Sequence, residues 1–199
     1  GSVIRKVVQS AVIYNVFGDV KENPALAAFT MNDLWKHSLA TGMAMEVIGK
    51  ADKKKIHFLL GTLHDIGKAV FMFRFPDHFA KVLELVESEN ASILNAEYEL
   101  LGITHADCGG ELAIHWDLPG EVRTAITSHH QPVKLTQHRR LAAMVHISDI
   151  AVRTMGIGYG GDPLMPVMDP YASRLQKSVE EIVKYKDDFS QQCDSILGT

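Results

Sequence analysis

Histidine is the main source of reactive side chains in this chain, with ten among 199 residues. His64 and Asp65 are adjacent and ionisable, yet they come at the end of the most apolar helical segment of the sequence. Ionisable groups in apolar surroundings are usually paired with one another or bound to a metal ion. A histidine that is hydrogen-bonded to a nearby carboxylate or backbone group explains such a pair equally well, so the pair alone does not establish a metal site.

Residues of the same ligand type occur in four other predicted helices: His37, His105, the doublet His129-His130, and Asp149. Imidazole and carboxylate ligands suit Fe, Mn, Zn or Ni, whereas a site for a soft metal would recruit the cysteines. Two such ions, held by about seven protein ligands, would turn a bridging water into hydroxide and would neutralise charge on a phosphoryl group. The pattern therefore predicts a site for two divalent metal ions with the chemistry of a phosphohydrolase.

The elements that must position these ligands are all predicted to be helices. Apolar residues recur at steps of three and four along most of the chain, and no segment alternates long enough to predict a strand. The segment 54–67 is apolar on nearly all sides, which places it at the centre of a multi-helix bundle. The all-α fold is expected to hold its metal site between central helices, and the predicted helices span about 3–17, 24–29, 34–49, 54–67, 76–88, 91–101, 105–116, 119–129, 139–156 and 178–197.

Composition narrows the classes of partner. The net charge of −4 and the pI near 6.2 provide no basic surface for nucleic acid or anionic lipid. No apolar run approaches the ~18 residues of a membrane span, and the start lacks the pattern of a signal peptide. Two distant cysteines without a CxxC motif indicate reduced thiols, so we expect a cytoplasmic protein. Gly1-Ser2 is interpreted as the remnant of a cleaved expression tag, and residues 3–199 as one domain.

The motifs around the ligands resemble a known superfamily. His37, followed by His64-Asp65-Ile66-Gly67-Lys68, His129-His130 and Asp149, resembles the HD superfamily of metal-dependent phosphohydrolases. Within that superfamily, the segments 34–40, 63–68, 104–109 and 156–163 resemble the HD-related output domain, HDOD. Together these segments cover about residues 3–170.

The resemblance implies an HD-type helical bundle of bacterial signalling proteins, often fused to sensor or receiver modules. It also implies that family helices upstream of Val3 are missing from this sequence, and that signalling modules or other proteins are the partners. By analogy with binuclear HD enzymes, Asp65 would bridge two metal ions. One ion would be held by His37, His64, Asp65 and Asp149, and the other by Asp65, His105, His129 and His130.

Three further residues have alternative interpretations. Lys68 falls three residues after Asp65, so it would share a helix face with the pair and clamp a substrate phosphate; alternatively, it is a solvated cation at a helix end. Asp33 is interpreted mainly as a helix cap and alternatively as an additional ligand. His146 competes with Asp149 for the ligand role, and we favour a supporting or core position for His146.

The chain also resembles the HD-GYP phosphodiesterases in its ligands, but it departs from them downstream. After His129-His130 comes Gln131-Pro132-Val133-Lys134, without a glycine-tyrosine-proline segment, which argues against cyclic di-GMP as the substrate. Three hypotheses follow. The chain is a metal-binding output domain, or an active phosphohydrolase or phosphodiesterase with a phosphorylated nucleotide as ligand, or a metal-free helical scaffold.

Overall fold

The computed structural model describes residues 24–26, 29–52 and 56–198, so the predicted helix at 3–17 lies outside the described part. Within these ranges every regular element is a helix, which confirms the all-α prediction. None of the described helices combines the length and apolar character needed to cross a membrane. The elements are η1 (Pro24–Leu26), α2 (Met31–Ile48), η2 (Gly49–Ala51), α3 (His57–Leu63), α4 (Ile66–Arg74), α5 (Pro76–Glu89), α6 (Ile93–Leu101), α7 (His105–His115), α8 (Gly120–Ser128), η3 (Pro132–Lys134), α9 (Arg139–Met155), η4 (Ala172–Leu175), α10 (Lys177–Val183) and α11 (Lys186–Leu197).

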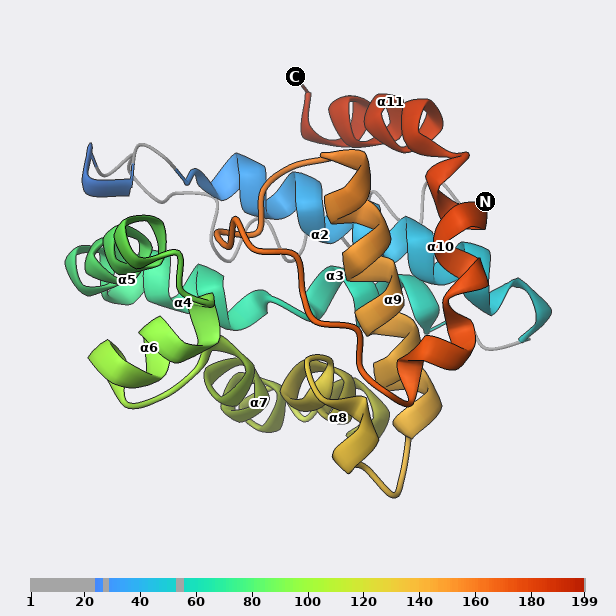
Figure 1. Cartoon of the computed structure of the whole chain (residues 1–199), viewed down its shortest axis with the longest axis horizontal. Coiled ribbons are helices and arrows are strands. Elements are labelled where there is room, and N and C mark those ends of the chain that lie inside the picture. Colours follow the sequence, from blue (N-terminus) through green and yellow to red (C-terminus); the bar gives the residue numbers. More distant parts are fainter. Residues whose placement is uncertain (1–23, 27–28, 53–55, 199) are drawn as a thin grey trace.

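The helices enclose two apolar clusters. One is formed by α3 to α8 together with parts of α2 and α9, and it includes Phe71, Phe79 and Ile126. The other lies among α2, α9, α10 and α11 and includes Met43 and Ile147. Helix α2 packs against both α3 and α9, so it belongs to both halves of the bundle (Figure 1).

The sequence predicted a single helix over 54–67, but the structure has two helices in this region, so the predicted bounds are wrong. Helix α3 ends at Leu63 and α4 begins at Ile66, so His64 and Asp65 form the junction between two helices. Helix α4 was not foreseen, because both sides of the junction are apolar and the hydrophobic pattern continues across it. The predicted helix at 178–197 is likewise divided, into α10 and α11.

The starts of two ligand-bearing helices are fixed by capping boxes. Thr104 is the N-cap of α7, as predicted, and its side chain accepts a hydrogen bond from Asp107 N. Thr30 caps α2 in the same way, and Asp33 is at the third helical position. The Asp33 carboxylate accepts a hydrogen bond from Thr30 N, so Asp33 is part of the cap of this helix, as predicted. A box of this kind satisfies two backbone N–H groups that the first helical turn leaves free.

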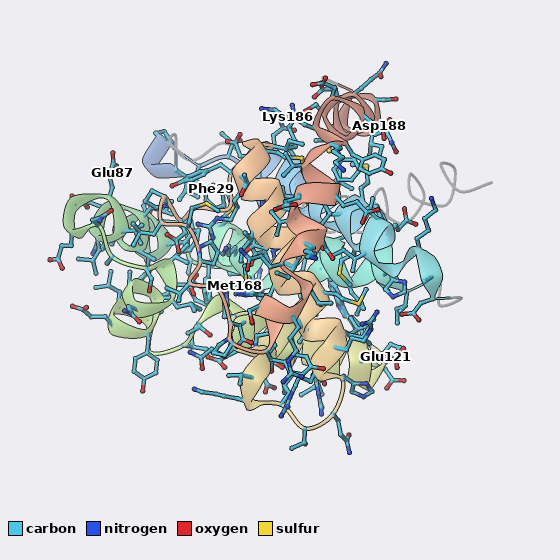
Figure 2. All side chains as sticks on the ribbon, turned by 45° about the vertical axis from the view of Figure 1, so that its right-hand side comes forward. Phe29, Glu87, Glu121, Met168, Lys186 and Asp188 are labelled. Atoms are coloured by element: carbon cyan, nitrogen blue, oxygen red, sulfur yellow. The ribbon has the colours of Figure 1, made fainter. Side chains whose placement is uncertain are left out.

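A long irregular segment, residues 156–170, runs from the end of α9 back along the bundle to η4; we call it the strap (Figure 1). The Arg153 guanidinium donates hydrogen bonds to the carbonyls of Asp162 and Leu164 in the strap. Near its start the strap contacts Phe29 through the ring of Tyr159. Near its end Met168 packs against the second apolar cluster, and Figure 2 labels Phe29 and Met168. The strap is therefore fastened along its length.

Candidate metal centre

The seven predicted ligands come together from five places in the fold. His64 and Asp65 lie at the α3–α4 junction, and His37 lies on α2. The others are His105, the first residue of α7, the doublet His129-His130 directly after α8, and Asp149 on α9. His130 is half-buried and the other six are buried. Residues spread over more than 110 positions of sequence thus form one polar cluster inside an apolar bundle.

The Asp65 carboxylate is at the centre of the cluster. Its Oδ1 lies 3.2 Å from His105 Nε2 and 3.7 Å from His129 Nε2. Its Oδ2 lies 3.4 Å from His64 Nε2 and 3.8 Å from His37 Nε2. Each oxygen therefore faces a different pair of imidazoles, which is the arrangement of a carboxylate that bridges two ions.

The Nδ1 atoms of three of the candidate ligand histidines have oxygen partners. His64 Nδ1 lies 2.7 Å from the Gly61 carbonyl, and His129 Nδ1 lies 2.8 Å from the Ile126 carbonyl. A carbonyl oxygen can only accept, so we assign the proton to Nδ1 in both rings, which leaves a lone pair on each Nε2. His105 Nδ1 lies 2.7 Å from the Glu97 carboxylate. Metal-binding histidines are usually oriented in this way by an oxygen at the second ring nitrogen.

Two of these Nε2 atoms, in the described structure those of His64 and His129, are buried without a hydrogen-bond partner, although both face the Asp65 carboxylate. A lone pair that faces an anion is unfavourable at low dielectric, so a proton or a metal ion on these nitrogens stabilises the cluster. The potential ligand atoms form two overlapping groups in which all atoms lie within 4.8 Å of one another: Asp65, His105, His129 and His130, and His37, His64 and Asp65. These donors fit divalent ions of the Fe, Mn or Zn type.

Asp149 and His146 occupy different positions relative to the cluster. Asp149 Oδ1 lies 3.1 Å from His37 Nε2, at the edge of the second group, where it can add a fourth ligand. His146 points elsewhere, because its Nδ1 lies 2.9 Å from the His129 carbonyl and its Nε2 accepts a hydrogen bond from Asp169 N. His146 therefore contacts the backbone that carries His129 and lies outside the two ligand groups.

Lys68 is inside the protein. The residue is 3% exposed, and its Nζ donates a 2.7 Å hydrogen bond to Asp65 Oδ2. It is therefore not the solvated cation of the alternative interpretation. The position beside the bridging carboxylate keeps a positive charge next to the cluster, and its role as a clamp for a substrate phosphate stays a prediction.

Burial and neighbouring charges set the protonation of the cluster. Burial lowers the pKa of His37, and it lowers the pKa of His129 to about 3, so both rings are neutral at physiological pH. Burial opposes ionisation of Asp65, but His64, Lys68 and His105 hold its pKa well below the usual range. Burial also opposes protonation of His105, yet the Glu97 carboxylate raises its pKa, so a metal ion would displace a proton there.

Glu97 is the important site residue that the sequence analysis missed. It is fully buried on α6, and its carboxylate binds both the backbone N–H (2.8 Å) and the ring Nδ1 (2.7 Å) of His105. Its position four residues after Ile93 puts it on the buried face of its helix, since residues four apart share a face. A carboxylate on an apolar helical face was the signal that could have identified it.

The two sides of the cluster differ in how they are covered. On the His37 side the strap lies close by, since a Cβ added to Gly160 would lie 3.5 Å from His37 Nε2 and 3.8 Å from Asp65 Oδ2. On the other side, a cleft of about 610 Å³ between α6, α7, α8 and η3 is lined by His130. The cluster is thus covered by backbone at one end and reached by a cleft at the other.

Comparison with known proteins agrees with this architecture. The HDOD domain family matches residues 3–132. An uncharacterised protein of Treponema pallidum (strain Nichols) is 27% identical over 125 residues, which are 60% of this chain but 24% of that longer protein. The crystal structure of an HDOD domain protein of unknown function from Geobacter sulfurreducens has a TM-score of 0.83 and 21% identity, covering 96% of this chain and 70% of that one. A proposed signal transduction protein from Marinobacter aquaeolei VT8 has a TM-score of 0.70 and 19% identity, covering 98% of this chain and 44% of that one.

Proposed function

The chain belongs to the HDOD domain family, and on that premise we propose that it is a signal-transduction output domain whose His/Asp cluster binds two divalent metal ions. One observation carries the proposal: His64 and His129 direct unpaired, buried Nε2 atoms at a carboxylate whose two oxygens face two different pairs of imidazoles. The proposed ligands of one ion are His37, His64, Asp65 and Asp149, and those of the other are Asp65, His105, His129 and His130.

A second function, hydrolysis of a phosphate ester, is favoured by the cleft that reaches His130. Bound divalent ions would supply Lewis-acid activation of water and of the phosphoryl oxygens. In such a reaction the water oxygen forms a bond to phosphorus, the ester P–O bond breaks, and the departing alcohol takes up a proton. Asp65 would hold the two metal positions together, and the Lys68 ammonium beside it would stabilise negative charge on the phosphoryl group.

The experiment is anaerobic reconstitution of the metal-free chain with Fe²⁺, Mn²⁺ or Zn²⁺, followed by hydrolysis of bis(4-nitrophenyl) phosphate. We expect turnover by the loaded wild type and none by Asp65→Asn, which keeps the shape of the side chain without its charge. Metal binding without turnover would refute the hydrolase and leave an output domain that binds metal. Failure to bind metal would refute both parts of the proposal.

A further inference from the structure

The strap has an exposed middle between two fastened parts. Val167 is 89% exposed and Met165 is 51% exposed, although both side chains are apolar. Pro166, which lies between them, has no backbone N–H to donate to the bundle. The strap is instead fastened on either side of this middle, at Asp162 and at Asp169.

The first anchor is Arg153 on α9, one turn after Asp149. Its Nη2 donates hydrogen bonds to the carbonyls of Asp162 and Leu164, and its Nη1 lies 3.8 Å from Asp149 Oδ2. One planar guanidinium therefore spans the strap and a proposed metal ligand. The Asp162 carboxylate also accepts a hydrogen bond from Ile93 N at the start of α6. Opening of the strap would remove the carbonyls that orient Arg153, and with them the ion pair that orients Asp149.

The second anchor is the Asp169 carboxylate at the end of the strap. It is buried and accepts a 3.0 Å hydrogen bond from Val133 N, three residues after the ligand His130. His146 connects the same part of the strap to the residue before that ligand. Its Nε2 accepts a hydrogen bond from Asp169 N (3.1 Å), and its Nδ1 donates one to the His129 carbonyl (2.9 Å). The end of the strap is thus bonded to the chain on both sides of the ligand doublet.

The strap also touches the first ligand group through its own backbone. Tyr159 N donates a hydrogen bond to the Asp33 carbonyl on α2. A Cβ on Gly158, which has a φ of +64°, would lie 2.3 Å from His37 N, and one on Gly160 would lie 3.5 Å from His37 Nε2. Opening of the strap would therefore uncover the His37 ring.

Metal binding and strap opening are linked because both involve the same ligands. An ion that binds only while the strap is closed lowers the population of open molecules by the factor 1 + [M]/Kd, which is about 100 at a metal concentration 100 times the Kd. The linkage is reciprocal, so a strap held closed also favours the bound ion.

Resting on the proposed metal centre, we infer that the strap is a metal-responsive segment. Ions at the two positions hold it closed, and their loss lets residues 163–168 move away from the bundle. The strap thereby reports metal occupancy at the surface, where Met165 and Val167 are exposed.

The test is hydrogen–deuterium exchange of the chain with and without Zn²⁺, followed by NMR, with the bound zinc measured by elemental analysis. Three amides report the attachments of the strap: Tyr159 N, Ile93 N and Val133 N. We expect each to exchange at least about tenfold more slowly in the zinc-loaded chain, because each is released only when the strap opens. The amide of Tyr185, which donates to the Ile182 carbonyl between α10 and α11, is the internal control and should exchange equally in both.

Two variants separate the anchors. Arg153→Gln should abolish the zinc-dependent slowing at Ile93 and keep it at Val133. His146→Phe, which replaces one ring by another without the two hydrogen bonds, should do the reverse. General destabilisation would affect both amides alike, and either variant suffices if the other does not fold. Arg123→Gln, at an exposed arginine of α8, is the matched control and should exchange like the wild type.

Each contrary result has a distinct meaning. Zinc that binds without slowing the three strap amides would overturn the inference while leaving the metal centre intact. Equal slowing at Tyr185 would show a general stabilisation and would also overturn it. Unchanged slowing at Ile93 in Arg153→Gln and at Val133 in His146→Phe would refute the two anchors. A chain that takes up no zinc, iron or manganese would refute the proposed function and this inference together.

Discussion

Gly67 lies where α4 crosses α7, and its replacement by alanine tests how the cluster is held together. The added Cβ would lie 1.9 Å from the His105 carbonyl oxygen and 2.9 Å from Gly109 N. Ordinary contact between carbon and oxygen begins near ~3.4 Å, so the two helices must separate by about 1.5 Å at this point. The atoms that are struck belong to the backbone and cannot rotate away. Because His105 is the first residue of α7, the same separation moves its ring away from Asp65.

Overpacking of this kind costs roughly 1–3 kcal/mol and sometimes more. Because the clash at Gly67 is with backbone, we expect Gly67→Ala to lower the free energy of unfolding by ~3 kcal/mol or more. For a chain of this length, that loss lowers the Tm by about 6–12 °C. The matched control is Gly120→Ala at the start of α8, where an added Cβ has no neighbour within 4 Å. Alanine favours helix over glycine, so that variant should be neutral or slightly more stable.

The assay is thermal unfolding of the metal-free proteins by calorimetry, followed by the metal content of reconstituted samples. Gly67→Ala should melt well below both the wild type and Gly120→Ala, and it should retain less metal than either. If the two variants melt within about 2 °C of each other and hold equal metal, the close helix crossing does not position His105 and the reasoning is refuted.

Three other predictions concern the supports and the protonation of the cluster. Glu97→Gln should lower metal affinity by ~10–100-fold in a chelator competition, since it weakens the partner that orients His105, and unchanged affinity would contradict this role. Gly160→Ala puts a methyl group 3.5 Å from His37 Nε2, where it should block the proposed metal position beside His37. The variant should therefore bind one metal equivalent fewer than the wild type, with the same Tm of the metal-free chain. If it still binds both equivalents, the metal position beside His37 does not depend on the space next to Gly160. In denaturant titrations of metal-free protein, the unfolding free energy should fall as the pH drops from about 6.5 to about 3. His129 alone contributes up to ~1.4 kcal/mol per pH unit to this fall, and His37, His130 and His146, whose pKa values are also lowered, contribute in the same direction. The reason is that His129 has a pKa of about 3 in the folded protein, so in this pH range it takes up a proton only when the protein unfolds. His105 has a raised pKa, so above pH 6.5 it changes the unfolding free energy in the opposite direction. An unfolding free energy that does not change with pH below about 6.5 would contradict the burial of a neutral His129.

The sequence predicted most of the helices and the ionisable residues that come together. Helical spacing of apolar residues predicted most of the helices, and Thr104 was recognisable as a cap because its hydroxyl precedes a periodic segment. The candidate ligands were recognisable because ionisable groups within apolar helices require a partner, and the structure brings all seven of these residues together.

The remaining features depend on tertiary contacts that periodicity does not encode. The pair His64-Asp65 was expected at the end of a helix, but the second helix that begins directly after it, α4, was missed because apolar residues flank the pair on both sides. Glu97 was missed because its partner His105 lies eight residues away in a different helix. The burial of Lys68 and the approach of the strap to His37 follow from packing between distant segments, which local sequence patterns do not report.

The most direct test of the account is the metal content of anaerobically purified protein, measured by elemental analysis for the wild type beside Asp65→Ala. The account predicts about two equivalents of Fe, Mn or Zn per wild-type chain and loss of most of that metal in Asp65→Ala, because this carboxylate faces both groups of ligands. A wild-type protein without metal, or an Asp65→Ala variant with undiminished metal, would contradict it.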